Sequence, residues 1–308
     1  MIVLGQKYRF HPLEKEQIQK LFPDFKELHY SDKSSEEILR FIEQEIDSNH
    51  SKLIVLNTKV QIPNEIIARL THLQFEQEIN YITIEHFLEK YLNKCYIPEE
   101  QRDISFLEKI KPFSPLQYLI KRCVDFSITI PLGIIILPIV IYTIYRIRKE
   151  SPDGPVLFKQ KRVGKNGREF ECIKFRSMRT DVNYFNHYTQ KDDPRIFPWG
   201  AIMRKTRLDE LPQLINVIKG EMHLIGPRAE WNELVAKYEE KIPFYNERHL
   251  IAPGITGWAQ VMYPYGANVE DARQKLMYDL YYIKNWSLWL ELKTAIKTIL
   301  VMLGKKGL

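Results

Sequence analysis

Two adjacent carboxylates, Asp209 and Glu210, lie in the segment 204–220, in which all other charged residues are basic. Arg204 and Arg207 precede them, so the carboxylates lie in a positive electrostatic environment that would attract a phosphate group. Two carboxylates in such a place can hold a divalent cation, or one of them can act as a nucleophile. The alternative is that Asp209 only caps a helix. On spacing alone, this structural role is the stronger interpretation.

Apolar residues at helical spacing follow the two carboxylates and predict a helix that packs on one face and ends at Gly220. These residues are Leu211, Leu214, Ile215 and Ile218. Pro212 is tolerated only in the first turn of such a helix, where Thr206 or Asp209 would be the cap. The carboxylates are therefore expected at a helix N-terminus, where unpaired N–H groups and the helix dipole favour anions.

A second basic cluster lies just upstream, in residues 158–178. Asn166 and Gly167, between two alternating runs, predict the turn of a β-hairpin. Alternation places Lys174 and Arg176 on one face of the second strand, two residues apart. Such a pair would suit a phosphate group, and a solvated basic strand is an equally good interpretation.

Two segments rich in glycine and proline, 223–228 and 251–261, predict loops whose backbone approaches a ligand closely. Downstream of them, Asp279 is the only acidic residue between Asp271 and Glu291.

The last predicted helix, 288–303, is strongly apolar. Trp286 and Trp289 lie at one end of it, and Lys305 and Lys306 lie at the other. This profile is typical of an interfacial helix that lies on a membrane surface.

Residues 126–145 contain no charge, and their length is close to the ~20 residues that a straight helix needs to cross a bilayer. A buried core helix is the alternative. Both ends of the run are flanked by basic residues, which the positive-inside rule assigns to the cytoplasmic face: Lys121, Arg122, Arg146, Arg148 and Lys149. Pro131 and Pro138 would let the segment enter the membrane, bend and return, whereas a straight span with a proline kink leaves one basic end outside.

The 308 residues divide into an acidic and a basic part. Residues 1–110 carry 14 Lys and Arg against 19 Asp and Glu, and residues 111–308 carry 31 against 20. The basic part needs an anionic partner, which could be nucleic acid, a phosphorylated substrate or an anionic membrane surface. Three widely separated cysteines, without metal-ligand spacing, argue against a disulfide framework and a zinc site, and they fit a reducing compartment.

Short apolar runs alternate with helical patterns in the first third of the chain, which predicts a small parallel α/β sheet. The expected strands are 1–4, 27–30, 53–56 and 81–84, and the expected helices are 13–22, 34–46 and 64–73. Gly5 is the only glycine before Gly133, so a glycine-rich loop for a dinucleotide is not expected. A regulatory or docking module is the preferred interpretation.

The order of the motifs in the rest of the chain resembles the bacterial sugar transferase family, the monotopic polyprenyl-phosphate phosphoglycosyl transferases. The resemblance covers about residues 114–308, and the N-terminal third looks like a shortened form of the α/β module found in longer members. The motifs are Lys121-Arg122-x-x-Asp125 with Pro138, KFRSM (174–178), DDPRI (192–196), RLDELPQLINVIKGEMHLIGPR (207–228), PGITGWAQV (253–261) and DLYYIKN (279–285).

The resemblance implies an enzyme that transfers sugar 1-phosphate from a UDP-sugar to polyprenyl (undecaprenyl) phosphate and releases UMP. This is the first membrane step in the assembly of a surface glycan, such as a capsule, exopolysaccharide, O-antigen or glycoprotein glycan. It implies that Asp209 is the nucleophile that carries a covalent phosphosugar, and that Asp209 and Glu210 hold Mg²⁺. The residues that match positions around the phosphates are Lys174, Arg176, Arg204, Arg228 and Asp279.

The implied fold is an α+β membrane-associated catalytic domain with a re-entrant membrane helix and interfacial amphipathic helices. A small Rossmann-like α/β domain with a parallel sheet precedes it. The expected divisions are an α/β module (1–97), a linker (98–113), a re-entrant helix bent at Pro138 (114–149) and the catalytic domain (150–308).

The implied location is the bacterial inner membrane, with the soluble parts facing the cytoplasm. The expected partners are a UDP-sugar, undecaprenyl phosphate and the inner leaflet, with a second copy of the chain as a further candidate. Nucleic acid is not expected, because it explains the positive charge but neither the apolar run nor the acidic pair.

Two positions depart from the family pattern. Leu137 stands where the family commonly has a serine, whose hydroxyl could bond to backbone groups freed by the bend. Ala229 stands where the family often has a proline. The alternatives to a transferase are a non-catalytic membrane scaffold, in which the carboxylates only cap a helix, and another metal-dependent membrane phosphotransferase.

Overall fold

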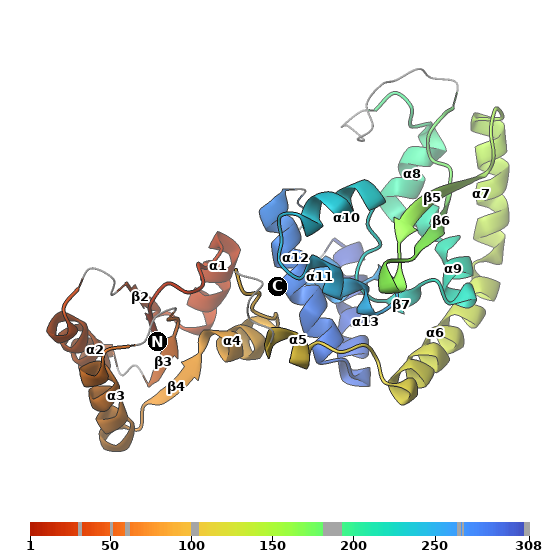
Figure 1. The fold of residues 1–308 in the computed structure, drawn as a ribbon. Helices are drawn as coiled ribbons and strands as arrows, with labels where there is room; N and C mark the ends of the chain where they lie inside the picture. Colours follow the sequence, from red (N-terminus) through yellow and green to blue (C-terminus); the bar gives the residue numbers. More distant parts are fainter. Residues whose placement is uncertain are drawn as a thin grey trace. The chain divides into compact units, whose positions relative to one another are not determined.

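The computed structural model describes residues 1–29, 33–49, 52–58, 62–99, 105–180, 193–263, 266 and 268–304. It separates into two compact units, Met1–Tyr96 and Ile97–Leu308 (Figure 1). Asp192 of the DDPRI motif, residues 100–104 of the expected linker, and Lys305 and Lys306 lie outside the described residues.

The N-terminal unit is built on a four-stranded parallel sheet with the strand order β2-β1-β3-β4. The strands are β1 (Ile2–Leu4), β2 (Lys26–Leu28), β3 (Leu53–Leu56) and β4 (Asn80–Thr83). The helices are α1 (Pro12–Leu21), α2 (Ser35–Asn49), α3 (Asn64–Gln77) and α4 (Ile84–Phe87), which continues as a π-helical turn at Leu88–Leu92. The expected parallel sheet is confirmed.

Side chains of this unit fill the carboxyl end of the sheet between β1 and β3, where open α/β sheets usually bind ligands. The buried Asn57 amide donates to the carbonyl oxygens of Tyr8 (2.8 Å) and Gly5 (3.3 Å). The fully buried Lys94 forms an ion pair with Glu14. This edge is therefore packed by the chain's own polar groups.

The second unit is mainly helical and contains two pairs of strands. Strands β5 (Leu157–Val163) and β6 (Glu169–Phe175) form the expected antiparallel hairpin, and β7 (His223–Ile225) pairs in parallel with β8 (Gly254–Thr256). The first helices are α5 (Ser105–Lys109), α6 (Pro115–Ile135), α7 (Leu137–Glu150), α8 (Pro198–Thr206) and α9 (Gln213–Lys219). Then follow α10 (Asn232–Glu239), α11 (Trp258–Met262), α12 (Val269–Lys284) and α13 (Leu288–Met302).

Helices α6 and α7 carry the uncharged run, and the chain bends by 60° between them. In the described chain, no single helix is long and apolar enough to cross a membrane, but this bent pair satisfies both criteria together. Pro138 lies in the first turn of α7, where its missing N–H breaks no bond within that helix. Pro131 lies inside α6 without ending it. The break between the two helices therefore lies at Ile136, beside Pro138, and α6 continues past Pro131.

Several helices of this unit expose large apolar side chains to solvent. On α7, α9 and α13 they include Leu137, Ile141, Ile215, Ile218, Trp289, Leu292, Ile296 and Ile299. The most exposed large apolar side chains of α6 are Leu116, Ile134 and Ile135. A soluble domain rarely leaves so much apolar surface in contact with water.

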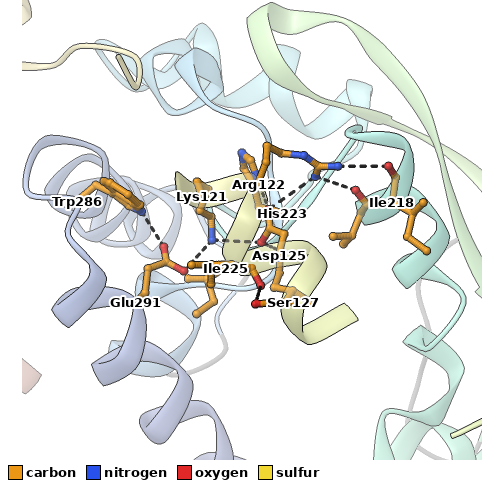
Figure 2. Close-up of polar contacts among 12 residues, drawn as sticks. Lys121, Arg122, Asp125, Ser127, Ile218, His223, Ile225, Trp286 and Glu291 are labelled. Carbon is orange, nitrogen blue, oxygen red and sulfur yellow. Dashed lines mark hydrogen bonds and ion pairs between the residues drawn. The ribbon is translucent and has the colours of Figure 1, made fainter. Parts of the chain in front are cut away.

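A buried ionic cluster fastens α6 to the rest of the unit (Figure 2). Lys121 Nζ lies 2.7 Å from Glu291 Oε2 of α13 and 3.4 Å from Asp125 Oδ1, and its side chain is 0% exposed. Asp125 Oδ2 lies 2.6 Å from His223 Nδ1, and its Oδ1 accepts the backbone N–H of Leu224 at 3.0 Å. The charge of Lys121 is thus neutralised inside the protein and does not face a membrane surface.

Arg122, the second basic residue before the apolar run, binds the carboxyl end of α9 (Figure 2). Its guanidinium donates to the carbonyl oxygens of Val217 (2.8 Å) and Ile218 (3.2 Å). Cations are favoured at this end of a helix because its last carbonyl groups lack intrahelical partners.

Candidate active site

The two adjacent carboxylates lie in a short 3₁₀ turn, Leu208–Glu210, between α8 and α9. Arg207 ends α8 in the left-handed conformation (φ 59°, ψ 18°), which redirects the chain before this turn. Helix α9 starts after Pro212 and has no side-chain cap. The expectation that Thr206 or Asp209 caps this helix is therefore wrong, and the Thr206 hydroxyl donates to carbonyl oxygens of α8 instead.

Helix α9 does not bury the apolar face expected from its spacing. Ile215 and Ile218 are 44% and 50% exposed, whereas Asn216 is fully buried. The Asn216 side chain accepts the N–H of Ile173 (3.0 Å) and donates to the carbonyl of Glu171 (2.7 Å), both on β6. These hydrogen bonds turn the polar side of α9 toward the hairpin and leave the two isoleucines outside.

Glu210 is held by two cations. Its Oε1 lies 2.8 Å from Lys174 Nζ, and its Oε2 lies 3.6 Å from Arg207 Nη1. Burial opposes ionisation of Glu210, but the charges of Lys174 and Arg228 outweigh it and lower the pKa of this carboxyl. Glu210 therefore remains ionised at neutral pH.

Asp209 has the opposite shift. Burial and the adjacent charge of Glu210 raise its pKa, although Lys174 and Arg204 partly counteract them. Neighbouring carboxylates whose environments push their pKa values apart are typical of sites with divided chemical roles. Asp209 is the more basic of the two and is therefore the better nucleophile once ionised.

Lys174 and Arg228 lie together at a small pocket beside Glu210. Arg204, on α8, is exposed and acts on Asp209 through its charge. The pocket is lined by Arg162, Cys172, Lys174, Glu210, Gln213, Met222, Arg228, Ala229, Gly254 and Ile255. Of these, sequence reasoning had singled out Lys174, Glu210 and Arg228 as site residues, and it missed Arg162 and Gln213.

Arg176 does not join this group. Its guanidinium is buried and donates to Ser151 Oγ (2.7 Å) and to the carbonyl oxygen of Pro155 (2.7 Å). Strand β6 ends at Phe175, so the alternation that placed Lys174 and Arg176 on one face does not extend this far. Arg176 fastens the loop that follows α7.

Asp279 is fully buried on α12 and lies behind the pocket rather than in its lining. Its Oδ2 lies 2.8 Å from Arg248 Nη2, which also donates to the carbonyl oxygen of Arg228 at 3.0 Å. Burial raises the pKa of Asp279 to about 6, although Arg248 counteracts it. Asp279 therefore acts through Arg248, a residue that no motif in the sequence had indicated.

The two glycine-rich loops approach each other rather than only a ligand. A Cβ atom on Gly254 would lie 2.1 Å from the backbone nitrogen of Gly226, and one on Gly257 would lie 2.0 Å from its carbonyl oxygen. Glycine is required at both positions for this contact. The close approach seen here joins the two loops, one of which carries Arg228, and a close approach to a ligand stays a prediction.

Residues 116–305 match the family model described as bacterial sugar transferase, which is more than half of the chain. The chain belongs to the bacterial sugar transferase family. It is 44% identical over 195 residues to a UDP-N-acetylgalactosamine-undecaprenyl-phosphate N-acetylgalactosaminephosphotransferase of Aeromonas hydrophila, a match that covers 63% of this chain and 46% of the relative.

Two other relatives are similar to this chain over 51% and 60% of its length. A UDP-glucose:undecaprenyl-phosphate glucose-1-phosphate transferase of Xanthomonas campestris pv. campestris is 43% identical over 162 residues, which are 51% of this chain and 34% of that protein. Exopolysaccharide production protein PSS of Rhizobium leguminosarum bv. phaseoli is 39% identical over 191 residues, which are 60% of this chain and 95% of that protein. The matched region thus spans less than half of the Aeromonas and Xanthomonas relatives.

Proposed function

We propose that this protein transfers sugar 1-phosphate from a UDP-sugar to undecaprenyl phosphate and releases UMP. The observation that carries the proposal is the pair Asp209 and Glu210, with opposite pKa shifts, beside Lys174 and Arg228. The pair lies within the region that matches the family. The names of the relatives in Aeromonas and Xanthomonas describe transfer from UDP-sugars to undecaprenyl phosphate.

In the first step, a carboxylate oxygen of Asp209 attacks the β-phosphorus of the UDP-sugar. A bond forms between this oxygen and phosphorus, and the bond from phosphorus to the bridging oxygen breaks, so that UMP leaves with the electron pair. Asp209 must be ionised for the attack but gives up no proton. Lys174, Arg204 and Arg228 provide positive charge where the leaving phosphate develops negative charge.

In the second step, a phosphate oxygen of undecaprenyl phosphate attacks the same phosphorus. The bond between phosphorus and Asp209 breaks, and the carboxylate is regenerated with the electron pair. No general base is needed, because both nucleophiles are already anionic.

The carboxylates of Asp209 and Glu210 fit a Mg²⁺ ion, and we propose that they hold one. Mg²⁺ takes oxygen ligands and is usually bound by one or two carboxylates, with water and substrate phosphates completing its shell. In the part of the chain that the structure describes, no three His, Cys, Asp or Glu side chains gather into a larger metal site. When bound, Mg²⁺ would neutralise charge on the diphosphate.

We further propose that α6 and α7 dip into the inner leaflet and return, with both soluble parts in the cytoplasm. The 60° bend beside Pro138 and the uncharged run support this topology. The exposed isoleucines of α9 and the exposed apolar side chains of α13 would rest at the membrane surface. Undecaprenyl phosphate would reach Asp209 from the same surface.

The test is an assay of UMP release by the full chain in lipid nanodiscs, with Mg²⁺ and a panel of UDP-sugars. Without the lipid acceptor, the peptide containing Asp209 should gain the mass of one sugar phosphate. Asp209→Asn should lose both the adduct and turnover, because an amide is a poor nucleophile. An adduct on another residue would contradict the assignment of the nucleophile, and absence of UMP release with every sugar would contradict the function.

A further inference from the structure

Gln213 and Arg162 are buried polar residues that line the pocket beside Glu210. They are 4% and 7% exposed. The Gln213 side chain forms no hydrogen bond with the described part of the protein. The Nε–H of Arg162 likewise has no partner there. Buried polar groups are nearly always hydrogen-bonded in native proteins, so the unpartnered Nε–H of Arg162, with the Gln213 side chain beside it in the pocket lining, indicates a ligand.

The charges around the pocket indicate that this ligand is an anion. Arg162, Lys174 and Arg228 contribute three positive charges, whereas Glu210 is the only carboxylate in the lining. Lys174 already pairs with Glu210. Among the described residues, Arg162 donates only to neutral oxygens, Gln160 Oε1 (2.7 Å) and the carbonyl of Ala229 (3.1 Å). A buried guanidinium without a carboxylate partner is costly unless an anion compensates its charge.

The size of the pocket limits what can enter it. Its volume is about 10 Å³, close to the space that one water molecule needs. A phosphate oxygen fits this space, but a uracil base or a sugar ring does not. We propose that Arg162 and Gln213 bind a non-bridging phosphate oxygen of a substrate, Arg162 through its Nε–H and Gln213 through its side-chain amide.

This inference rests on the proposed function, which supplies two candidate phosphates. One is the diphosphate of the nucleotide sugar and the other is the phosphate of the lipid acceptor. Both phosphates have anionic non-bridging oxygens. The two phosphates can be distinguished because the nucleotide sugar reacts in the first step and the lipid acceptor in the second.

The main test is Gln213→Glu, which preserves the shape of the side chain but adds a carboxylate that repels phosphate. Because Gln213 forms no hydrogen bond within the described protein, this change breaks no hydrogen bond of the fold. Gln213→Leu removes the amide donor without adding charge. The matched control is Gln19→Glu, the same chemical change at an exposed position of α1 in the N-terminal unit.

Three quantities are measured on the full chain in nanodiscs, together with thermal unfolding of each variant. They are UDP binding by calorimetry without divalent metal, UMP release without acceptor, and transfer from the preformed adduct to undecaprenyl phosphate. We expect Gln213→Glu to weaken one of them by about 10-fold or more, the loss that corresponds to a hydrogen bond with a charged group. Gln213→Leu should weaken the same quantity to a smaller extent, and Gln19→Glu should change none.

Loss of UDP binding and of UMP release assigns the oxygen to the nucleotide sugar, and loss of the second transfer alone assigns it to the lipid phosphate. Either result supports the proposal. Arg162→Lys keeps the charge but lacks the Nε–H, and it should weaken the same quantity. The proposal is overturned if a folded Gln213→Glu protein matches the wild type within twofold in all three quantities. If the wild type binds UDP but releases no UMP, the proposed function fails while the binding measurement still tests the phosphate contact.

Discussion

Replacing Lys121 by methionine should strongly destabilise the C-terminal unit, Ile97–Leu308. The change keeps the length of the side chain, so it leaves little cavity, but it removes the cation between Glu291 and Asp125 (Figure 2). Both carboxylates are nearly inaccessible to water. Removing one partner of a buried ion pair typically costs about 3–5 kcal/mol, because the other charge stays buried without compensation.

This cost converts into a measurable change in melting temperature. For domains of roughly 150–250 residues, which includes Ile97–Leu308, each kcal/mol lowers Tm by about 2–4 °C. Lys121→Met should therefore lower Tm by about 6–20 °C. Tryptophan fluorescence in detergent micelles is a suitable assay, because Trp286 donates to Glu291 in the same cluster.

The control for this prediction is Lys237→Met on α10, where the lysine is exposed. A surface change of this kind should alter stability by no more than about 0.5 kcal/mol. Adding Glu291→Gln to Lys121→Met should restore part of the lost Tm, because the amide is neutral and still accepts hydrogen bonds from Tyr282 and Trp286. If Lys121→Met melts like the control, or if the losses of the two single variants simply add, the buried ion pair does not stabilise the position of α6.

Three further predictions concern pH, topology and the N-terminal unit. The pKa of Asp279 is raised to about 6, so transferase activity should decline as the pH falls through this value. The free energy of unfolding should rise over the same range, because the folded state binds the proton more tightly than the unfolded chain. Activity profiles and urea unfolding between about pH 7.5 and 5 measure the two effects. Cysteines placed at 111 and 153, in a background without the native cysteines, should both be protected from a membrane-impermeant reagent in intact spheroplasts. If Pro138→Ala straightens the bend, one of these two cysteines should become labelled. A chain that begins at Ile97 should retain UMP release in nanodiscs, because the carboxyl edge of the N-terminal sheet is filled by its own side chains; a folded but inactive protein would contradict this.

The spacing of apolar residues predicted those helices and strands that bury one apolar face. The strand 53–56 agrees with β3 residue for residue, and the turn at Asn166 and Gly167 joins β5 to β6. Such patterns failed where a single residue changes the backbone direction. The left-handed Arg207 inserts a separate 3₁₀ turn, so Asp209 lies before α9 without capping it.

Contacts between distant segments were not predictable from one sequence. Lys121 and Glu291 are 170 residues apart, and Arg248 is 31 residues from Asp279. Lys121 attracted notice as a basic residue at the end of an apolar run, a pattern that says nothing about a buried carboxylate from the last helix. In the sequence, Gln213 is only a polar residue in an apolar helix. The structure adds that its side chain is buried in the pocket lining and forms no hydrogen bond with the described chain.

The same ionic cluster connects α6 to the pocket beside Glu210. Asp125 of α6 holds both His223 and Leu224 on β7. The chain continues directly from β7 through Gly226 to Arg228, and Gly226 is fixed by its N–H bond to the carbonyl of Thr256 (2.9 Å). A shift of α6 relative to the core would therefore be transmitted along the chain from β7 to Arg228. One strand, β7, thus connects α6 to Arg228, so variants that loosen Asp125 should impair catalysis even though Asp125 does not line the pocket.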